Sequence, residues 1–293
     1  TLFRSDVRTM ALQGDTLWIG SLNGLYTYQL NTKKLASLDS KSNGLPHHTI
    51  YSIIRTTDNQ IYVGTYNGLC RYIEESGKFE NIPLPVNRSV SNLFVNSLLE
   101  DTSRQCIWIG MEGSLFQYTP ATGLMKPIDA FHNNSIKSLA LDGDGNLLAG
   151  TDNGLYVYQN DNGTLQHIVH DSRNIQSLTN NIIWNIFADQ EQNIWLGTDY
   201  GISLSRYNSA LQFIPISQIT GTGDGNQFYS LFRDSKGFYW FGGTNGVIRF
   251  TNPTGNKHDA VWYRMGDKHH PLSHNRIRHI YEDREQQLWI ATD

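Results

Sequence analysis

The sequence of 293 residues has little charge and no long hydrophobic run. Charged residues make up 17% of the chain, below the roughly 25% that is usual for globular proteins. No stretch of about 18 apolar residues is present, so no transmembrane helix is expected. The net charge of −4 offers no basic surface, and we expect no nucleic-acid partner.

Cysteine is also scarce. The two cysteines, Cys70 and Cys106, are too few for a disulfide framework, and their spacing fits no zinc motif. We expect them to be small, half-buried strand residues, with a single disulfide as the alternative. The chain starts at Thr1 without an initiator methionine or a signal peptide, which predicts a fragment of a longer protein. No metal and no cofactor are expected.

Aromatic residues and glycine are abundant, and they recur in one repeated phrase. Aromatics reach 12%, and 26 glycines stand against 8 prolines, a balance typical of short strands joined by tight turns. The phrase reads LWIGSLNGLY at residues 17–26, WLGTDYGI at 195–202 and WFGGTNGV at 240–247. Its anchor glycines are Gly20, Gly64, Gly110, Gly150, Gly197 and Gly242, with Ala291 in the seventh place. A spacing of roughly 40–50 residues is that of one propeller blade.

The repeat predicts an all-β fold, a seven-bladed β-propeller of four-stranded antiparallel blades whose last blade is incomplete. Blade 2 has its strands A to D at residues 50–55, 61–65, 69–72 and 79–82, and no stretch shows helical periodicity. Residues 1–293 are expected to form a single propeller. Its blades are predicted at residues 1–40, 41–84, 85–129, 130–170, 171–216, 217–266 and 267–293 (partial).

Most positions repeat from blade to blade, which indicates a structural role. Two apolar columns in strand A should pack between blades, and the anchor glycine should let blades approach closely. The aromatic columns of strands B and C are interpreted as core rather than as stacking platforms. The column of strand B holds Trp18, Tyr62, Trp108, Trp195, Trp240 and Trp289, with Leu148 as the exception.

One column varies while its neighbours repeat, and it is the predicted ligand site. It lies one residue into strand A and holds Arg8, Tyr51, Asn96, Lys137, Trp184, Tyr229 and Arg278. The turns between strands B and C should reach the same face, with Tyr66 and Tyr200 as further site residues. Stacking rings, hydrogen-bonding groups and cations together suit a sugar, especially an acidic one. The alternative is a set of solvated strand ends around an empty channel.

The sequence carries no recognisable catalytic signature. The glycine-rich phrases open hairpins rather than helices, so they do not form phosphate loops. One Asp recurs in each A–B turn, as in Asp58 and Asp189, and is interpreted as a turn former. Histidines offer the one alternative: His48, His270 and His279 could serve a lyase, and His279 stands in a column of small polar residues. No catalytic residue is assigned.

The repeated phrase resembles the two-component regulator propeller repeat. The full copy DQEQNIWLGTDYGI at 189–202 and the lead-ins LTNNI at 178–182 and LSHNRI at 272–277 carry the resemblance, which covers essentially the whole chain. Blades 3 and 4 depart from the pattern at residues 111–114 and at Leu148. The resemblance implies the periplasmic, N-terminal sensor propeller of a hybrid two-component histidine kinase from gut bacteria. In that family a second propeller, a membrane helix and a kinase follow, and oligosaccharides are the signals.

Three functions follow from these observations. The first is a periplasmic module that senses an oligosaccharide and signals to a kinase outside this sequence, in a homodimeric parent protein. On this hypothesis the chain itself is not an enzyme. The second is a propeller enzyme, a polysaccharide or lactone lyase that uses histidines on the channel face. The third is a scaffold or dimerisation propeller without a ligand.

Overall fold

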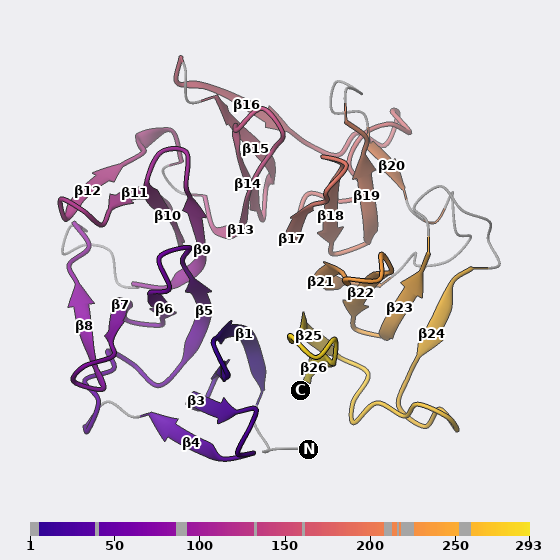
Figure 1. Cartoon of the computed structure of the whole chain (residues 1–293). Helices are drawn as coiled ribbons and strands as arrows, with labels where there is room; N and C mark the ends of the chain where they lie inside the picture. The colour runs from indigo at the N-terminus through magenta and orange to yellow at the C-terminus, as the bar shows by residue number, and fades with distance from the viewer. Residues whose placement is uncertain are drawn as a thin grey trace. The chain divides into compact units, whose positions relative to one another are not determined.

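The computed structural model describes residues 6–38, 41–85, 93–131, 134–159, 162–207, 213–215, 217, 226–251 and 259–293. The chain forms two compact units, Thr1–Ile136 and Lys137–Asp293. Both consist of antiparallel sheets in which sequential strands are neighbours (Figure 1). The architecture is that of β-propeller blades, and the predicted ends of blades 1 and 5, at residues 40 and 216, lie outside the described residues.

The first unit contains three four-stranded blades. The first strands of successive blades, β1, β5 and β9, pack against one another, while β4, β8 and β12 form the outer edges (Figure 1). The short 3-10 helix η1 (Asp129–Phe131) follows blade 3. The strands are β1 (Val7–Gln13), β2 (Thr16–Ser21), β3 (Gly24–Gln29), β4 (Leu35–Leu38), β5 (Ile50–Arg55), β6 (Ile61–Thr65), β7 (Gly68–Ile73), β8 (Lys78–Ile82), β9 (Val95–Asp101), β10 (Cys106–Met111), β11 (Ser114–Thr119) and β12 (Leu124–Pro127).

The second unit contains three four-stranded blades and a two-stranded sheet, β25–β26. The first residue of β13, Ile136, belongs to the first unit. The described residues thus complete six blades rather than the seven predicted, and a two-stranded sheet follows the sixth. The strands are β13 (Ile136–Leu141), β14 (Leu147–Thr151), β15 (Gly154–Gln159), β16 (Thr164–Ile168), β17 (Ile183–Ala188), β18 (Ile194–Thr198), β19 (Gly201–Ser205), β20 (Phe213–Pro215), β21 (Phe228–Arg233), β22 (Tyr239–Gly243), β23 (Gly246–Phe250), β24 (Val261–Tyr263), β25 (Ile277–Glu282) and β26 (Leu288–Thr292).

The B–C hairpin explains why the phrase Thr-x-Asn-Gly repeats. In blade 2 the Thr65 hydroxyl accepts a hydrogen bond from the Asn67 N–H at 3.0 Å and donates to the Gly68 carbonyl at 2.9 Å. Gly68 has φ +112°, a conformation that side chains disfavour. The same pair of bonds recurs at Thr151 and Thr198, so the phrase encodes a turn.

Blades approach closely at the anchor glycines, as predicted. A β-carbon on Gly64 would lie 2.7 Å from the carbonyl oxygen of Val95 in the next blade, and one on Gly197 would lie 2.6 Å from that of Phe228. Two apolar columns of strand A fill the rest of each interface. One consists of Val7 and its equivalents in later blades, and the other of Met10 and its equivalents. Val95 and Phe228 are fully buried, and no residue in either column is more than 9% exposed.

The recurring Asp residues form the A–B turns of blades 3 to 7, as predicted, and four of them also bind the tryptophan of strand B. In blade 2 the prediction of Asp58 is wrong, because the Thr56 hydroxyl accepts from the Gln60 N–H at 3.0 Å in its place. Asp189 accepts hydrogen bonds from the Asn193 N–H at 2.8 Å and from the Trp195 indole N–H at 2.8 Å. Both Asp189 and Trp195 are buried. Equivalent indole bonds reach Asp101, Asp234 and Asp283 in blades 3, 6 and 7.

The cysteines and the search for a membrane span bear on two further expectations. Cys70 and Cys106 are free thiols, so the alternative of a disulfide is wrong, and both are fully buried rather than half-buried. Burial raises the pKa of the Cys70 thiol far above its usual value. Within the described ranges, no helix has the length and apolar character needed to cross a membrane.

Candidate functional site

The variable column coincides with a β-bulge. In blades 1, 2, 3, 5, 6 and 7 the register between strands A and B skips one residue of strand A. A bulge leaves an extra residue outside the ladder and re-aims its side chain. The residues skipped are Arg8, Tyr51, Asn96, Trp184, Tyr229 and Arg278.

Four residues of the column form one contiguous group in the second unit. The Lys137 ammonium lies 4.9 Å from the centroid of the Trp184 ring, which meets the Tyr229 ring edge-on at 5.3 Å. The Arg278 guanidinium lies 4.8 Å from the Tyr229 centroid. We call Lys137, Trp184, Tyr229 and Arg278 the cation–aromatic ladder, because a cation caps each end of an aromatic pair.

Hydrogen bonds from neighbouring turns fix the two rings of the ladder. The Trp184 indole N–H donates to the Asp199 carboxylate at 3.0 Å, and Gln227 Nε2 donates to the same oxygen at 2.6 Å. The Tyr229 hydroxyl donates to the Gln227 side-chain oxygen. Burial raises the pKa of the Tyr229 phenol, against the opposing effect of the nearby Arg278 charge. Tyr229 is therefore a neutral hydroxyl at pH 7.

The two cations of the ladder differ in their partners. Arg278 binds the Asp293 carboxylate through two hydrogen bonds, of 2.6 and 3.1 Å, and Arg276 adds a third of 3.3 Å. Burial alone would raise the pKa of Asp293, but the hydrogen bonds and charges of these arginines outweigh it and lower that pKa. Lys137 has no carboxylate within ion-pair distance among the residues that the structure describes. Its charge is available to a ligand.

In the first unit, aromatic side chains from two predicted positions join a continuous row. Tyr66 lies 4.0 Å from Phe94 and 4.9 Å from His47, measured between ring centroids. Tyr51 lies 5.7 Å from Phe94, and His48 stacks on His47 at 4.2 Å. We call these five residues the aromatic row. Tyr66 is 39% exposed, so part of the row is open to solvent.

A cavity of about 280 Å³ adjoins the row along the chain. Its lining includes Pro46, Asn67 and Leu93, each of which is the immediate chain neighbour of a row residue. The remaining lining is largely apolar, from the end of blade 2.

The three other predicted site residues, Arg8, Asn96 and Tyr200, are not members of either group. Arg8 is close enough to Tyr51 for its charge to oppose the burial that raises the Tyr51 pKa. Asn96 is half-buried, and its side chain makes no hydrogen bond to another described residue. Tyr200 is 54% exposed, and its ring contacts no other ring in the described part of the chain. The structure thus unites seven of the nine predictions in or beside two groups and leaves Asn96 and Tyr200 apart.

Residues missed by the sequence reasoning share one position. Phe94, Gln227 and Arg276 each stand immediately before the first apolar residue of strand A. That position varies between blades just as the bulge column does, so the same comparison made two residues earlier would have found them. His47 and Asp293 were also missed as site residues, although His47 lies in the lead-in to strand A and Asp293 aligns with Asp199 in the repeated phrase.

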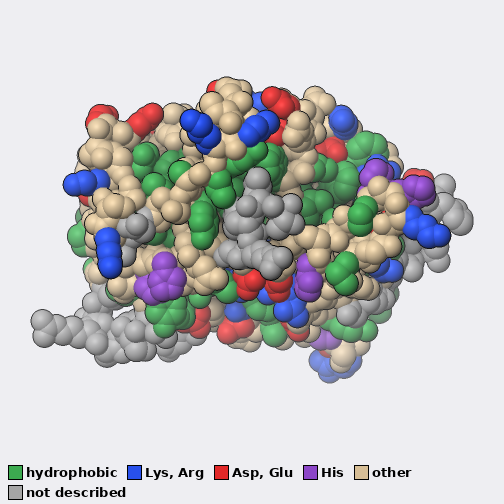
Figure 2. Space-filling view, turned by 90° about the horizontal axis from the view of Figure 1, so that it is seen from below, with side chains coloured by type: hydrophobic (Ala, Val, Ile, Leu, Met, Phe, Trp, Pro, Cys, Tyr) green, Lys and Arg blue, Asp and Glu red, His purple; other side chains and the backbone are tan. Residues whose placement is uncertain are grey.

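The described histidines do not gather into a metal site. Figure 2 shows histidine side chains exposed on one face of the molecule. No group of three or more His, Cys, Asp or Glu side chains in the described residues could hold a metal ion. Of the lyase candidates, His48 stacks on His47, and His270 lies 6.1 Å from the Tyr263 ring. The Nδ1 atom of His279 is buried and has no hydrogen-bond partner among the described residues.

His279 is expected to make folding depend on pH. Burial lowers its pKa to about 4, so the native state holds it neutral while the unfolded chain titrates near 6.5. The unfolded state therefore binds more protons between these values, and stability should fall as pH falls from 6.5 to 4, by up to roughly 3 kcal/mol. Urea unfolding at pH 7.5 and 4.5 measures this loss.

The matched control is His279→Ser, because Ser138 and Ser230 occupy the same column. Their hydroxyls accept hydrogen bonds of 2.9 Å from backbone N–H groups of the next blade, so serine suits this position. The variant should lose clearly less stability than the native chain over the same pH interval. An equal loss in both proteins would show that His279 is not the titrating group.

Comparison with known proteins gives the same architecture. The family described as two component regulator propeller matches at residues 44–67, 177–200, 222–245 and 271–293. Histidine kinase P4 of Formosa agariphila is 30% identical over 282 residues, which is 85% of this chain and 19% of that protein. The chain therefore spans only a small part of this relative's length.

Solved structures add one close and one distant relative. The extracellular domain of the putative hybrid two-component system BT4673 from B. thetaiotaomicron is 82% identical, with a TM-score of 0.69. The alignment covers 99% of this chain and 39% of that one. A streptogramin B lyase structure is 15% identical with a TM-score of 0.71, over 98% of this chain and 91% of that one, and shows the shared fold alone.

Proposed function

Because the chain belongs to the two-component regulator propeller family, we propose that it is the ligand-sensing part of a hybrid two-component receptor. It is an extracytoplasmic propeller, like the extracellular domain that it resembles at 82% identity. The observation that carries the ligand-sensing role is the cation–aromatic ladder. Four side chains from four successive blades meet there, in a column that varies while the two apolar columns of strand A repeat.

The ligand class is an oligosaccharide. Sugar rings present C–H faces that stack on aromatic rings and hydroxyls that need hydrogen-bonding partners. Hydrogen bonds fix the rings of Trp184 and Tyr229, and the polar side chains of Asp199 and Gln227 lie beside these rings. Lys137 adds a charge without a carboxylate partner among the described residues, which favours an acidic sugar.

The chain itself is proposed to be non-catalytic. An acid–base histidine needs a pKa near neutrality and an orienting partner. Burial lowers the pKa of His279 to about 4, and its Nδ1 atom has no hydrogen-bond partner in the described residues. The likeness to a lyase at 15% identity concerns the fold only.

The parent protein is proposed to be a periplasm-facing, homodimeric sensor kinase of the inner membrane. A second propeller and a membrane-anchored kinase would be the partners of this chain within it. The pair β25–β26 carries the bulge, the indole–Asp bond and the apolar columns of the other blades, so we count it as half of a seventh blade.

Removing the Trp184 ring should abolish most ligand binding. Titration calorimetry of the chain against uronic-acid-containing and neutral oligosaccharides would identify a ligand. Trp184→Ala should then weaken its binding roughly 10-fold or more, because stacking and the contact with Lys137 are both lost. Lys137→Met should weaken binding of acidic ligands selectively.

Tyr207→Ala is the control, since Tyr207 is an exposed ring outside the ladder, 47% accessible to solvent. It should bind like the native chain. Failure of a folded chain to bind any oligosaccharide, or unchanged affinity of Trp184→Ala, would contradict the proposal.

A further inference from the structure

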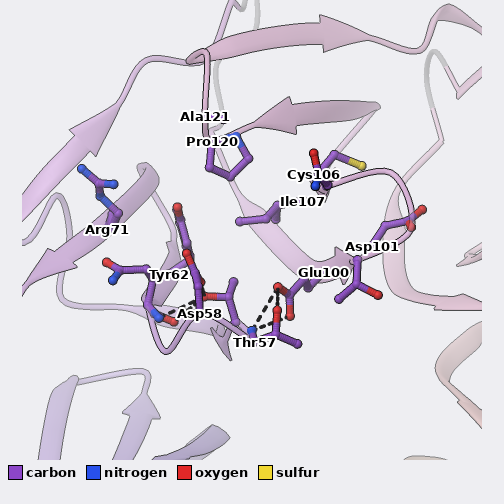
Figure 3. Close-up of a pocket in the computed structure, with 14 residues that line it drawn as sticks. Thr57, Asp58, Tyr62, Arg71, Glu100, Asp101, Cys106, Ile107, Pro120 and Ala121 are labelled. Carbon is purple, nitrogen blue, oxygen red and sulfur yellow. Dashed lines mark hydrogen bonds between the residues drawn. The ribbon is translucent and has the colours of Figure 1, made fainter.

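A second cavity, of about 630 Å³, opens in the first unit between blades 2 and 3 (Figure 3). It lies at the A–B turns, the ends of the strands opposite to the bulges. Thr57 and Asp58 of the blade 2 turn, Glu100 of β9 and Pro120 of the blade 3 C–D turn surround it. This cavity shares no residue with the cation–aromatic ladder or the aromatic row.

The cavity lies where the repeat departs from its pattern. In blade 3 the Trp108 indole N–H donates to the Asp101 carboxylate at 3.1 Å, a bond that recurs in blades 5, 6 and 7. Blade 2 has Tyr62 in the tryptophan column and Thr56 in the place of the indole-binding Asp, and the nearby Asp58 carboxylate accepts from the Thr56 hydroxyl at 2.5 Å. Tyr62 and Asp58 both line the cavity. An indole that bridges turn and strand elsewhere is missing here, and open space adjoins the position.

The polar lining is held in place by bonds between the two blades. The Glu100 carboxylate accepts hydrogen bonds from the Thr57 N–H at 2.8 Å and from the Thr57 hydroxyl at 2.8 Å. Gln60 and Gln105 add side-chain amides to the lining, while Ile107 and Pro120 give it apolar surface. Fixed acceptors beside an apolar wall are the usual composition of a small-molecule site.

The charges of the lining disfavour an anion. Arg71 is the one cation among the lining residues, and it is paired with Glu80 at 2.7 Å. Asp101 is paired with Arg104 at 2.8 Å. Asp58 and Glu100 have no cationic partner in the described part of the chain, so the cavity has an excess of negative charge.

We propose that this cavity is a second binding site, which takes a neutral sugar of one or two rings. Its volume lies within the roughly 300–1,000 Å³ typical of ligand pockets. The carboxylates of Asp58 and Glu100 would accept hydrogen bonds from sugar hydroxyls, and the wall at Ile107 and Pro120 would cover a C–H face. The same carboxylates reject uronic acids, in contrast to the ladder, where Lys137 favours them.

Tyr62→Trp is the variant that tests the site. It exchanges the buried phenol for a larger indole, next to the lining residues Thr56 and Asp58, and so fills part of the cavity. Saturation-transfer NMR and titration of the full chain with maltose, cellobiose and mannobiose should detect binding of at least one of them. That binding should weaken 10-fold or more in Tyr62→Trp, while the melting temperature is maintained.

Two further variants separate this site from the ladder. Gln60→Ala removes a lining amide without filling the cavity, and it should weaken the same disaccharide several-fold even if Tyr62→Trp proves unstable. Trp184→Ala should leave disaccharide binding here unchanged, whatever its effect on the ladder. Absence of binding by all three disaccharides, equal binding by the native chain and Gln60→Ala, or a preference for a uronic acid would each overturn the proposal.

Discussion

Gly197→Ala is expected to destabilise the protein by about 3 kcal/mol, the upper end of the cost of overpacking a core by a single carbon. The added β-carbon would lie 2.6 Å from the carbonyl oxygen of Phe228, and real β-carbons essentially never approach another atom so closely. The contact is with backbone of the next blade, so no rotamer change can relieve it. The blades would have to separate, and the fully buried Phe228 side chain would lose packing. Thermal unfolding should show a fall of roughly 5–10 °C in melting temperature.

The matched control is Gly143→Ala in the same unit. Its β-carbon would also meet an atom closely, at 2.2 Å, but that atom is the side-chain oxygen of Gln192. A flexible side chain can move away at little cost, and neither Gly143 nor Gly197 has a positive φ. The control should therefore melt within about 2 °C of the native chain. Similar losses in both variants would show that close packing between blades is not what the anchor glycine provides.

Asp189→Ala should cost about 3–5 kcal/mol, since it leaves several buried donors without acceptors. The carboxylate accepts from the Trp195 indole at 2.8 Å and from the Tyr239 hydroxyl at 3.1 Å, and both side chains are buried. It also accepts from the backbone N–H and the side-chain amide of Asn193, at 2.8 and 3.0 Å. Urea unfolding with tryptophan fluorescence measures the loss and reports on Trp195 itself.

Blade 4 supplies the control, because Leu148 stands there in the tryptophan column. Asp142 makes the same turn, accepting from the Asn146 N–H at 2.8 Å and its side-chain amide at 2.9 Å, but it has no indole to bind. Asp142→Ala should therefore lose only the turn, about 1–2 kcal/mol. If the two variants lost equal stability, the indole bond would contribute nothing measurable.

The repeated part of the structure could be predicted from the sequence. The strands of blade 2 were placed at residues 50–55 and 61–65, where β5 and β6 lie, because the alternation of apolar residues and the Asn-Gly turn are local signals. Gly64 and Gly197 were assigned to close approaches between blades, and the distances to Val95 and Phe228 confirm this. A column that repeats gives the same evidence for its structural role in each blade, so one chain suffices to identify it.

The site could be predicted only in part. The variable column was identified, but not the bulge that sets it apart, because Trp184 and Tyr229 carry no local mark of a register shift. Asp199 and Gln227, which hold these rings, come from a turn and a lead-in whose mutual distance depends on the packing of whole blades. The larger cavity was not predicted, because it depends on the space that the Tyr62 side chain leaves open.

The bulge has a consequence for how such propellers can diversify. A side chain that stands outside the pairing of strands A and B can be exchanged without altering the sheet or the apolar columns on either side of it. Arginine, tyrosine, asparagine, tryptophan and lysine are all accommodated at this place in one chain. Single substitutions in this column can thus change the side chains presented at the candidate site while the blades keep their structure. A designer who varies only these positions would keep a stable scaffold.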